Sequence, residues 1–110
     1  MMRLTGAEAE ERAVELRKDR GCRVVARNWR RRFGEIDIVA RDGQTLVFIE
    51  VKARSGDGFG GAVDTRKKGR VAVAAGQFLQ ETGCELPARF DVVAFSGDRS
   101  TLLRDAFSVG

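Results

Sequence analysis

Apolar residues recur at helical spacing in two stretches of the chain, and each stretch predicts an amphipathic helix. The spacings are i, i+3 and i+4, which place the side chains on one face that can pack against a core. These faces consist of Ala9, Ala13 and Leu16 in the first stretch, and of Val71, Ala74, Ala75, Phe78 and Leu79 in the second. Thr5 and Glu8 have the spacing of a capping box at the start of the first helix. We therefore expect one helix over residues 5–19 and a second over residues 65–82.

The remaining stretches are rich in β-branched and aromatic residues. They predict strands over residues 23–29, 34–40, 46–52 and 89–95, with a short fifth strand around residues 101–103. A helix that crosses between the third and fourth strands makes their pairing parallel. The chain is therefore expected to form one α/β domain over residues 1–110, with a central mixed five-stranded sheet flanked by two main helices.

The second and third strands are expected to form a hairpin. Asp42-Gly43 is a strong signal for a two-residue turn, because both turn positions favour a positive φ. If these two residues are the loop, Asp37 faces Phe48, and Glu35 faces Glu50. Asp37 and Glu50 are then diagonal neighbours, roughly 7–8 Å apart at the backbone.

This register divides the hairpin into a charged face and an apolar face. The charged face carries Glu35, Asp37, Glu50 and Lys52, and the apolar face carries Ile36, Ile38, Ala40, Val47, Ile49 and Val51. A one-residue bulge would break this division. Charges inside apolar sequence are costly unless they are paired or bind a metal, so the cluster is a candidate for chemistry.

Two carboxylates without any histidine in the chain favour a hard, oxygen-liganded cation, Mg²⁺ or Mn²⁺, over zinc. Asp37 and Glu50 would bind the metal, and Lys52 would hold or activate an attacking water and stabilise charge on a phosphate. The alternative is an ion-pair cluster of these three residues at the end of a sheet. The sequence leaves both interpretations open.

Composition narrows the class of protein. With 43% hydrophobic and 33% charged residues, the 110-residue chain is typical of a folded soluble domain. Its longest apolar run, residues 71–75, is far short of the roughly 20 residues that span a bilayer, and residues 1–5 lack the apolar stretch of a secretory signal. Cys22 and Cys84 have no metal-site spacing. We therefore expect no membrane contact, free thiols and a cytoplasmic location.

A net charge of +4 and a sequence pI near 9.7 favour polyanionic partners. The basic residues form two clusters: Arg27, Arg30, Arg31 and Arg32 around Trp29, and Arg66, Lys67, Lys68 and Arg70 at the start of the second helix. They suit phosphate groups, and an exposed Trp29 could stack on an unpaired base. The alternative is a solvated basic loop with Trp29 in the core. The glycine-rich residues 54–63 read either as a mobile loop beside the site or as a plain connector.

Several motifs together resemble a known family. They are Gly34-Glu35-Ile36-Asp37, the run from Phe48 to Arg54, Phe59-Gly60, and Arg89-Phe90-Asp91-Val92. They closely resemble the YraN-type family of uncharacterised bacterial proteins, which looks like a minimal member of the PD-(D/E)xK nuclease superfamily. The resemblance implies a restriction-endonuclease-like fold, with Asp37 and Glu50 as metal ligands and Lys52 as the catalytic lysine.

The resemblance also implies Glu10, on the first helix, as a further acid of the site, and Lys67 as a matching basic position. On a helical wheel Glu10 falls between Ala13 and Val14, so it is the glutamate of this helix that points along the buried face. A glutamate at the rim that pairs with Arg17 is the alternative.

The leading hypothesis is a Mg²⁺- or Mn²⁺-dependent endonuclease that hydrolyses DNA phosphodiesters, with branched or flapped structures among its substrates. The Val51 carbonyl would join the metal ligands, and the phosphate backbone would be held by Arg31, Arg32, Lys67 and Lys68. Two other classes stay open: a non-catalytic nucleic-acid-binding module, and a protein-interaction or dimerisation subunit. The nuclease superfamily that the chain resembles is related to archaeal Holliday-junction resolvases, which work as dimers, so a homodimer is an expectation by analogy.

Overall fold

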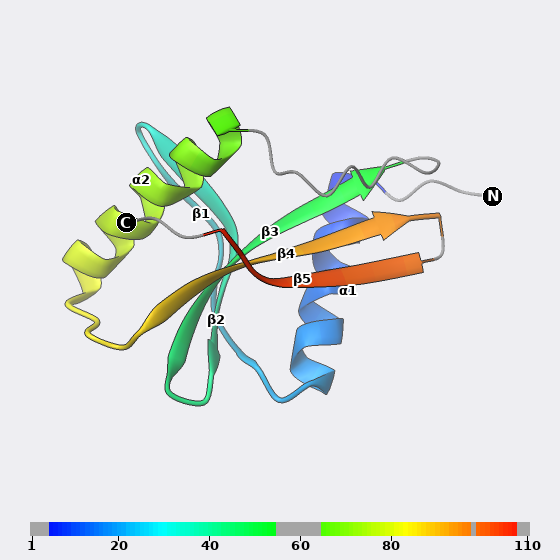
Figure 1. The fold of residues 1–110 in the computed structure, drawn as a ribbon, viewed down its shortest axis with the longest axis horizontal. Coiled ribbons are helices and arrows are strands. Elements are labelled where there is room, and N and C mark those ends of the chain that lie inside the picture. The colour runs from blue at the N-terminus through cyan, green and yellow to red at the C-terminus, as the bar shows by residue number, and fades with distance from the viewer. Residues whose placement is uncertain (1–4, 55–64, 98, 108–110) are drawn as a thin grey trace.

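The computed structural model describes residues 5–54, 65–97 and 99–107, apart from the side chains of residues 54, 65–67 and 107. Within these residues the chain forms α1 (Gly6–Asp19), β1 (Arg23–Arg31), β2 (Gly34–Asp42), β3 (Thr45–Arg54), α2 (Thr65–Thr82), β4 (Ala88–Ser96) and β5 (Arg99–Phe107). The strands form one sheet in sequence order, antiparallel except between β3 and β4 (Figure 1). The expected α/β architecture with a mixed sheet and two helices is confirmed.

The two helices pack on opposite faces of the sheet and create two apolar clusters. One cluster lies under α1 and contains Ala9, Ala13, Val14, Ile38, Ala40, Val47, Ile49, Val93 and Phe95. The other lies under α2 and contains Ile36, Val39, Leu46, Phe48, Val71, Ala74, Ala75, Phe78, Phe90, Val92 and Ala94. Both helical faces that the spacing predicts are therefore the packing faces. No helix of the described segments is long and apolar enough to cross a membrane.

Both helices have the ends that the sequence indicates. The Thr5 hydroxyl accepts a hydrogen bond from the Glu8 backbone N–H at 3.1 Å, which satisfies one of the free donors of the first turn of α1. Gly21 and Gly83, which follow the helices, have φ values of +85° and +68°. A residue with a side chain would be strained in that conformation, which explains glycine at both helix ends.

The fifth strand is longer than expected. It pairs with β4 from Ser96↔Arg99 to Phe90↔Phe107, whereas the sequence predicts a short strand near residues 101–103. The register shifts between Phe90 and Val92, and Asp105 has a φ of +53° opposite this shift. Because the pairing partner β4 supplies the backbone hydrogen bonds, polar residues of β5 join the sheet without a β-rich sequence of their own.

The expected hairpin register is wrong by two residues. Asp42 pairs with Thr45 and Val39 with Phe48, so the two loop residues are Gly43 and Gln44. Gly43 has a φ of +60°, and Gln44 is not among the residues with positive φ. A glycine at the first of two turn positions is the pattern of a type II′ turn, rather than the turn with two positive φ angles that Asp42-Gly43 suggested. The pairing of β3 with β2 is displaced by two residues, which is an even number. The side chains of β3 therefore stay on the sheet faces that the sequence predicts.

At Asn28 and Asp37 the side chains of the paired strands β1 and β2 change the sheet face on which they lie. One residue that was predicted on the apolar face therefore lies on the other face. Ile36 was expected beside Ile38, yet it lies in the cluster under α2 while Ile38 lies under α1. Its register partner Trp29 packs on the same α2 side. Asn28 has a φ of +49°, and the Asn28–Asp37 position lies between the paired residues on either side. A local rotation of both strands at this position accounts for the change.

Candidate active site

Asp37 lies where β2 separates from β3. The ladder between these strands ends at Ile38↔Ile49, although β2 continues beside β1 to Gly34, and β3 continues beside β4 to Arg54. At this fork the Val51 backbone N–H donates to Asp37 Oδ2 at 2.8 Å. A side-chain oxygen thus takes the hydrogen bond that a neighbouring strand would otherwise accept. The half-buried Asp37 carboxylate is thereby fixed between the two strands.

Glu50 is the first residue of β3 beyond the last ladder pair, and Asp37 is the first of β2. If the observed register is extended by one position, Asp37 stands opposite Glu50, rather than diagonal to it as the sequence suggested. Glu50 is buried, with 1% of its surface exposed. Lys52 is half-buried two residues farther along the same face of β3. The three residues that carry the sequence motif thus lie on adjacent strands at the fork.

Glu10 lies on α1, which packs on the sheet face lined by Ile38 and Ile49. It is half-buried next to the buried Ala9, as the helical wheel predicts. The alternative ion pair with Arg17 is not the arrangement found, because Arg17 is itself buried and donates from Nη2 to Cys22 Sγ at 3.3 Å. Across the described residues no group of three or more His, Cys, Asp or Glu side chains forms a metal-binding cluster.

The basic segment around Trp29 is a hairpin anchored on α2, and Trp29 belongs to the core side of it. The Trp29 ring meets Phe78 edge to face, with centroids 5.3 Å apart. Arg31 covers this ring at 3.9 Å and binds Glu81 with two hydrogen bonds, 2.8 and 2.6 Å long. These hydrogen bonds hold the pKa of Glu81 below its ordinary value. Of the two interpretations of Trp29, the structure therefore supports a core anchor.

The other predicted phosphate contacts have different surroundings. Arg32 is exposed at the tip of the hairpin, with its guanidinium 5.1 Å from the centre of the Phe33 ring. Lys68 is half-buried in the first turns of α2. The Lys67 side chain and the glycine-rich residues 55–64 lie outside the described part of the chain.

Gly34 holds the hairpin against α2, a role that the sequence did not reveal. A Cβ atom at this position would overlap the Arg70 carbonyl oxygen and come within 2.9 Å of the Ala74 nitrogen. Beside it, Glu35 pairs with Arg30 and with Arg70, each at 3.4 Å. The one available signal was the glycine itself, since a glycine within a strand often marks a close approach of another backbone.

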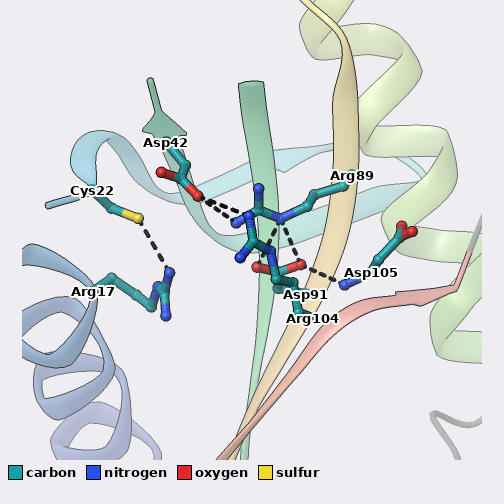
Figure 2. Close-up of polar contacts among 7 residues, drawn as sticks. All are labelled: Arg17, Cys22, Asp42, Arg89, Asp91, Arg104 and Asp105. Carbon is teal, nitrogen blue, oxygen red and sulfur yellow. Dashed lines mark hydrogen bonds and ion pairs between the residues drawn. The ribbon is translucent and has the colours of Figure 1, made fainter. Parts of the chain in front are cut away.

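A second charged cluster, at the other end of β2, is structural (Figure 2). Arg89 donates to Asp42 at 2.9 Å and to Asp91 at 3.1 Å, and Asp91 also accepts the Asp105 backbone N–H at 2.8 Å. Asp91 is fully buried and forms an ion pair with Arg89. All its carboxylates meet arginines or backbone donors, so this cluster ties β2, β4 and β5 together.

The fork has the donor set of a magnesium site. Asp37 uses Oδ2 for the Val51 N–H, so its other carboxylate oxygen can still bind a ligand. Two neighbouring carboxylates and a backbone carbonyl such as that of Val51 are oxygen donors, and magnesium completes its shell with water and substrate phosphate. These residues therefore fit a hard divalent cation.

Comparison with known proteins places the chain among relatives whose role is not described. The model of the uncharacterised protein family UPF0102 matches residues 9–95. A UPF0102 protein of Ralstonia nicotianae is 49% identical, over 96% of this chain and 87% of its own length. A UPF0102 protein of Shewanella amazonensis is 44% identical, over 93% of this chain and 97% of its own length. The match includes the whole fork and both of its strands.

Proposed function

This chain belongs to the UPF0102 family of YraN-type proteins, and from its acidic fork we propose that it is a metal-dependent nuclease acting on DNA phosphodiesters. The observation that carries the proposal is the 2.8 Å hydrogen bond from the Val51 N–H to Asp37 Oδ2. It fixes one carboxylate opposite the buried Glu50, where β2 and β3 separate. A rigid pair of carboxylates at an opening is the arrangement needed to hold a cation against a phosphate.

Each residue of the fork has a distinct role in this proposal. Asp37, Glu50 and the Val51 carbonyl would hold Mg²⁺ or Mn²⁺. When bound, the cation stabilises charge on the phosphate and lowers the pKa of its water. Lys52 would orient the attacking water and stabilise the developing negative charge. Water adds to phosphorus, the bond to one bridging oxygen breaks, and that oxygen takes up a proton.

Binding of the DNA backbone is assigned to basic residues on α2 and the β1–β2 hairpin. Arg32, Lys67 and Lys68 would contact phosphates, which gives affinity without sequence specificity. Arg31 would add positive charge at the surface, while its two hydrogen bonds to Glu81 keep the hairpin on α2. Glu10 would support the site from α1.

Cleavage assays with fork variants test the proposal. Purified protein is incubated with linear, flapped and four-way-junction DNA in Mg²⁺ or Mn²⁺. We expect Asp37→Asn, Glu50→Gln and Lys52→Met each to lower the cleavage rate by on the order of 10²-fold or more, because each removes a group that stabilises the transition state. Calorimetric titration with Mn²⁺ should show a site that is lost in Asp37→Asn and Glu50→Gln.

A matched control is Glu85→Gln, which removes an exposed carboxylate between α2 and β4, near the end of β3 that lies opposite to the fork. This variant should cleave at the wild-type rate. Cleavage that persists unchanged in the fork variants would contradict the assigned site. Salt-sensitive DNA binding without any cleavage would identify a non-catalytic nucleic-acid-binding module instead.

A further inference from the structure

The turn of the β1–β2 hairpin displays an aromatic ring to solvent. Arg31 pairs with Gly34, so Arg32 and Phe33 form the two-residue loop at the tip. Phe33 is 66% exposed, more than any other large apolar side chain in the described part of the chain; the next, Val25, is 46% exposed. A single exposed apolar side chain is common on protein surfaces, so the surroundings of the ring, rather than its exposure alone, identify a binding site.

Positive charge surrounds this ring. Phe33 lines a pocket of about 380 Å³ together with Arg30, Arg32 and Arg70. The Arg32 guanidinium stands 5.1 Å from the ring centre, and Glu35, the acid of this pocket, is already shared between Arg30 and Arg70. The balance around the ring is therefore basic, which suits a polyanion rather than an apolar or cationic partner.

The tip is also rigid. Gly34 packs directly on the α2 backbone, Arg31 binds Glu81 through two hydrogen bonds, and Trp29 packs on Phe78. These contacts come from three successive turns of α2 and leave the hairpin little freedom to move. A ring held in place in this way loses little conformational entropy when a ligand stacks on it.

We propose that Phe33 is a stacking platform for an unpaired base of DNA, with Arg30 and Arg32 on the adjoining phosphates. Aromatic rings between arginines are the general means of binding single-stranded nucleic acid, because every base has a face on which a ring can stack. This inference rests on the proposed nuclease function and narrows its substrate to DNA with a single-stranded branch. The structure thus gives Phe33 the role that the sequence suggested for Trp29.

The distance between the ring and the fork agrees with such a substrate. Phe33 and Asp37 are four positions apart along the chain, which corresponds to about 13 Å in an extended strand. Stacked nucleotides advance about 3.4 Å each along one strand. A base on Phe33 would therefore lie within a few nucleotides of a phosphate at Asp37, close to the junction of duplex and single strand.

Binding without cleavage tests this inference. All variants are made in the Asp37→Asn background and measured in EDTA, by fluorescence anisotropy, on a linear duplex and on the same duplex with a single-stranded flap. Phe33→Ala should weaken flap binding by about tenfold and duplex binding by less than about twofold, since only the unpaired base stacks. Phe33→Trp should keep the preference, and Phe33→Leu should lose it, because leucine supplies apolar surface without a ring.

Val25→Ala is the control, because it truncates an exposed apolar side chain on β1, outside the tip of the hairpin, and should leave both affinities unchanged. A 2-aminopurine in the flap should be quenched by the wild-type ring and not by Phe33→Ala. Equal losses on duplex and flap, no loss on either, or Phe33-dependent binding only to anionic vesicles would overturn the inference. Since the assay needs no metal, a Phe33-dependent flap preference without nuclease activity would refute the proposed function alone.

Discussion

Asp37 shows how one side chain can decide where a sheet divides. Its carboxylate accepts the Val51 N–H and so satisfies a donor that β2 would bind if the ladder continued. The strand pairing can therefore end without leaving a buried donor unsatisfied. The same hydrogen bond holds the carboxylate in the opening that it helps to create, so structure and proposed chemistry share one contact.

The lowered pKa of the Asp42 carboxyl predicts how acid changes the stability of the folded protein. Its hydrogen bond from Arg89 is the main cause that lowers its pKa below the ordinary value of 3.8, and the charges of Arg89, Arg104 and Arg17 act in the same direction. A carboxylate whose pKa is lower in the folded state stabilises the protein above the unfolded-state pKa, and this contribution is lost as the pH falls through the folded-state value. Stability should therefore fall when the pH drops below about 4.

Urea unfolding at about pH 7 and about pH 3 measures this effect. Asp42→Asn should be less stable than wild type near neutrality and should lose less stability on acidification, because it lacks the titrating group. Asp19→Asn, at an exposed aspartate outside the cluster, serves as the comparison. An Asp42→Asn variant that loses as much stability as wild type would exclude this carboxylate as a source of acid sensitivity.

At the scale of elements, the β1–β2 hairpin is tied to α2 more closely than strand order suggests. Gly34 touches the α2 backbone. Glu35 pairs with Arg70 and Arg31 pairs with Glu81, and these two partners lie eleven positions apart on α2. Figure 1 shows the hairpin crossing behind this helix. β2 makes these contacts with α2 through residues that lie beyond the point where it separates from β3.

Gly34→Ala should disturb this attachment. The added methyl group would overlap the Arg70 carbonyl, and relief requires a shift of the hairpin or the helix, with a cost of about 1–3 kcal/mol in unfolding free energy. Gly76→Ala on α2 is the control, since nothing lies within 4 Å of its added Cβ and alanine favours a helix. Denaturant midpoints should fall for the first variant and stay level or rise for the second. Equal midpoints would mean that the contact at Gly34 is adaptable.

At the scale of the whole molecule, charge is unevenly distributed. The net charge of +4 is modest, and two arginines, Arg89 and Arg104, are paired with the carboxylates of Asp42 and Asp91. Exposed positive charge is retained around the hairpin tip, where the Arg30 side chain is 71% exposed and the Arg70 side chain, on the adjacent α2, is 54% exposed. Attraction of a polyanion should therefore be directed to the side of the molecule that carries the hairpin.

The salt dependence of DNA binding tests this distribution. The logarithm of the affinity should fall linearly with the logarithm of salt concentration, and Arg32→Gln should reduce the slope by about one, because one phosphate contact is lost. Arg12→Gln is the control, since it removes an exposed arginine on α1 and should leave the slope unchanged. Equal slopes in the wild type and in Arg32→Gln would place the phosphate contacts elsewhere.

The sequence by itself determined the order and type of the elements, and it indicated a candidate site on two of the strands. Helical spacing, the Thr5 cap and the glycines after each helix are local signals, and they located α1 and α2 because helix hydrogen bonds are local as well. The same holds for the charged positions of β2 and β3, since alternation along a strand is a local property. The mixed sheet followed from the order of the elements.

Only the tertiary structure decided how these elements meet. The hairpin register depends on pairing between strands and on a turn in which one glycine takes the positive φ. The register that the motif Asp42-Gly43 predicts is therefore wrong by two residues. The facing of Ile36, the burial of Trp29 and the exposure of Phe33 depend on the packing of Gly34 against α2, some forty residues away in the chain. Such long-range contacts leave no periodic signal in the sequence, because each is made only once.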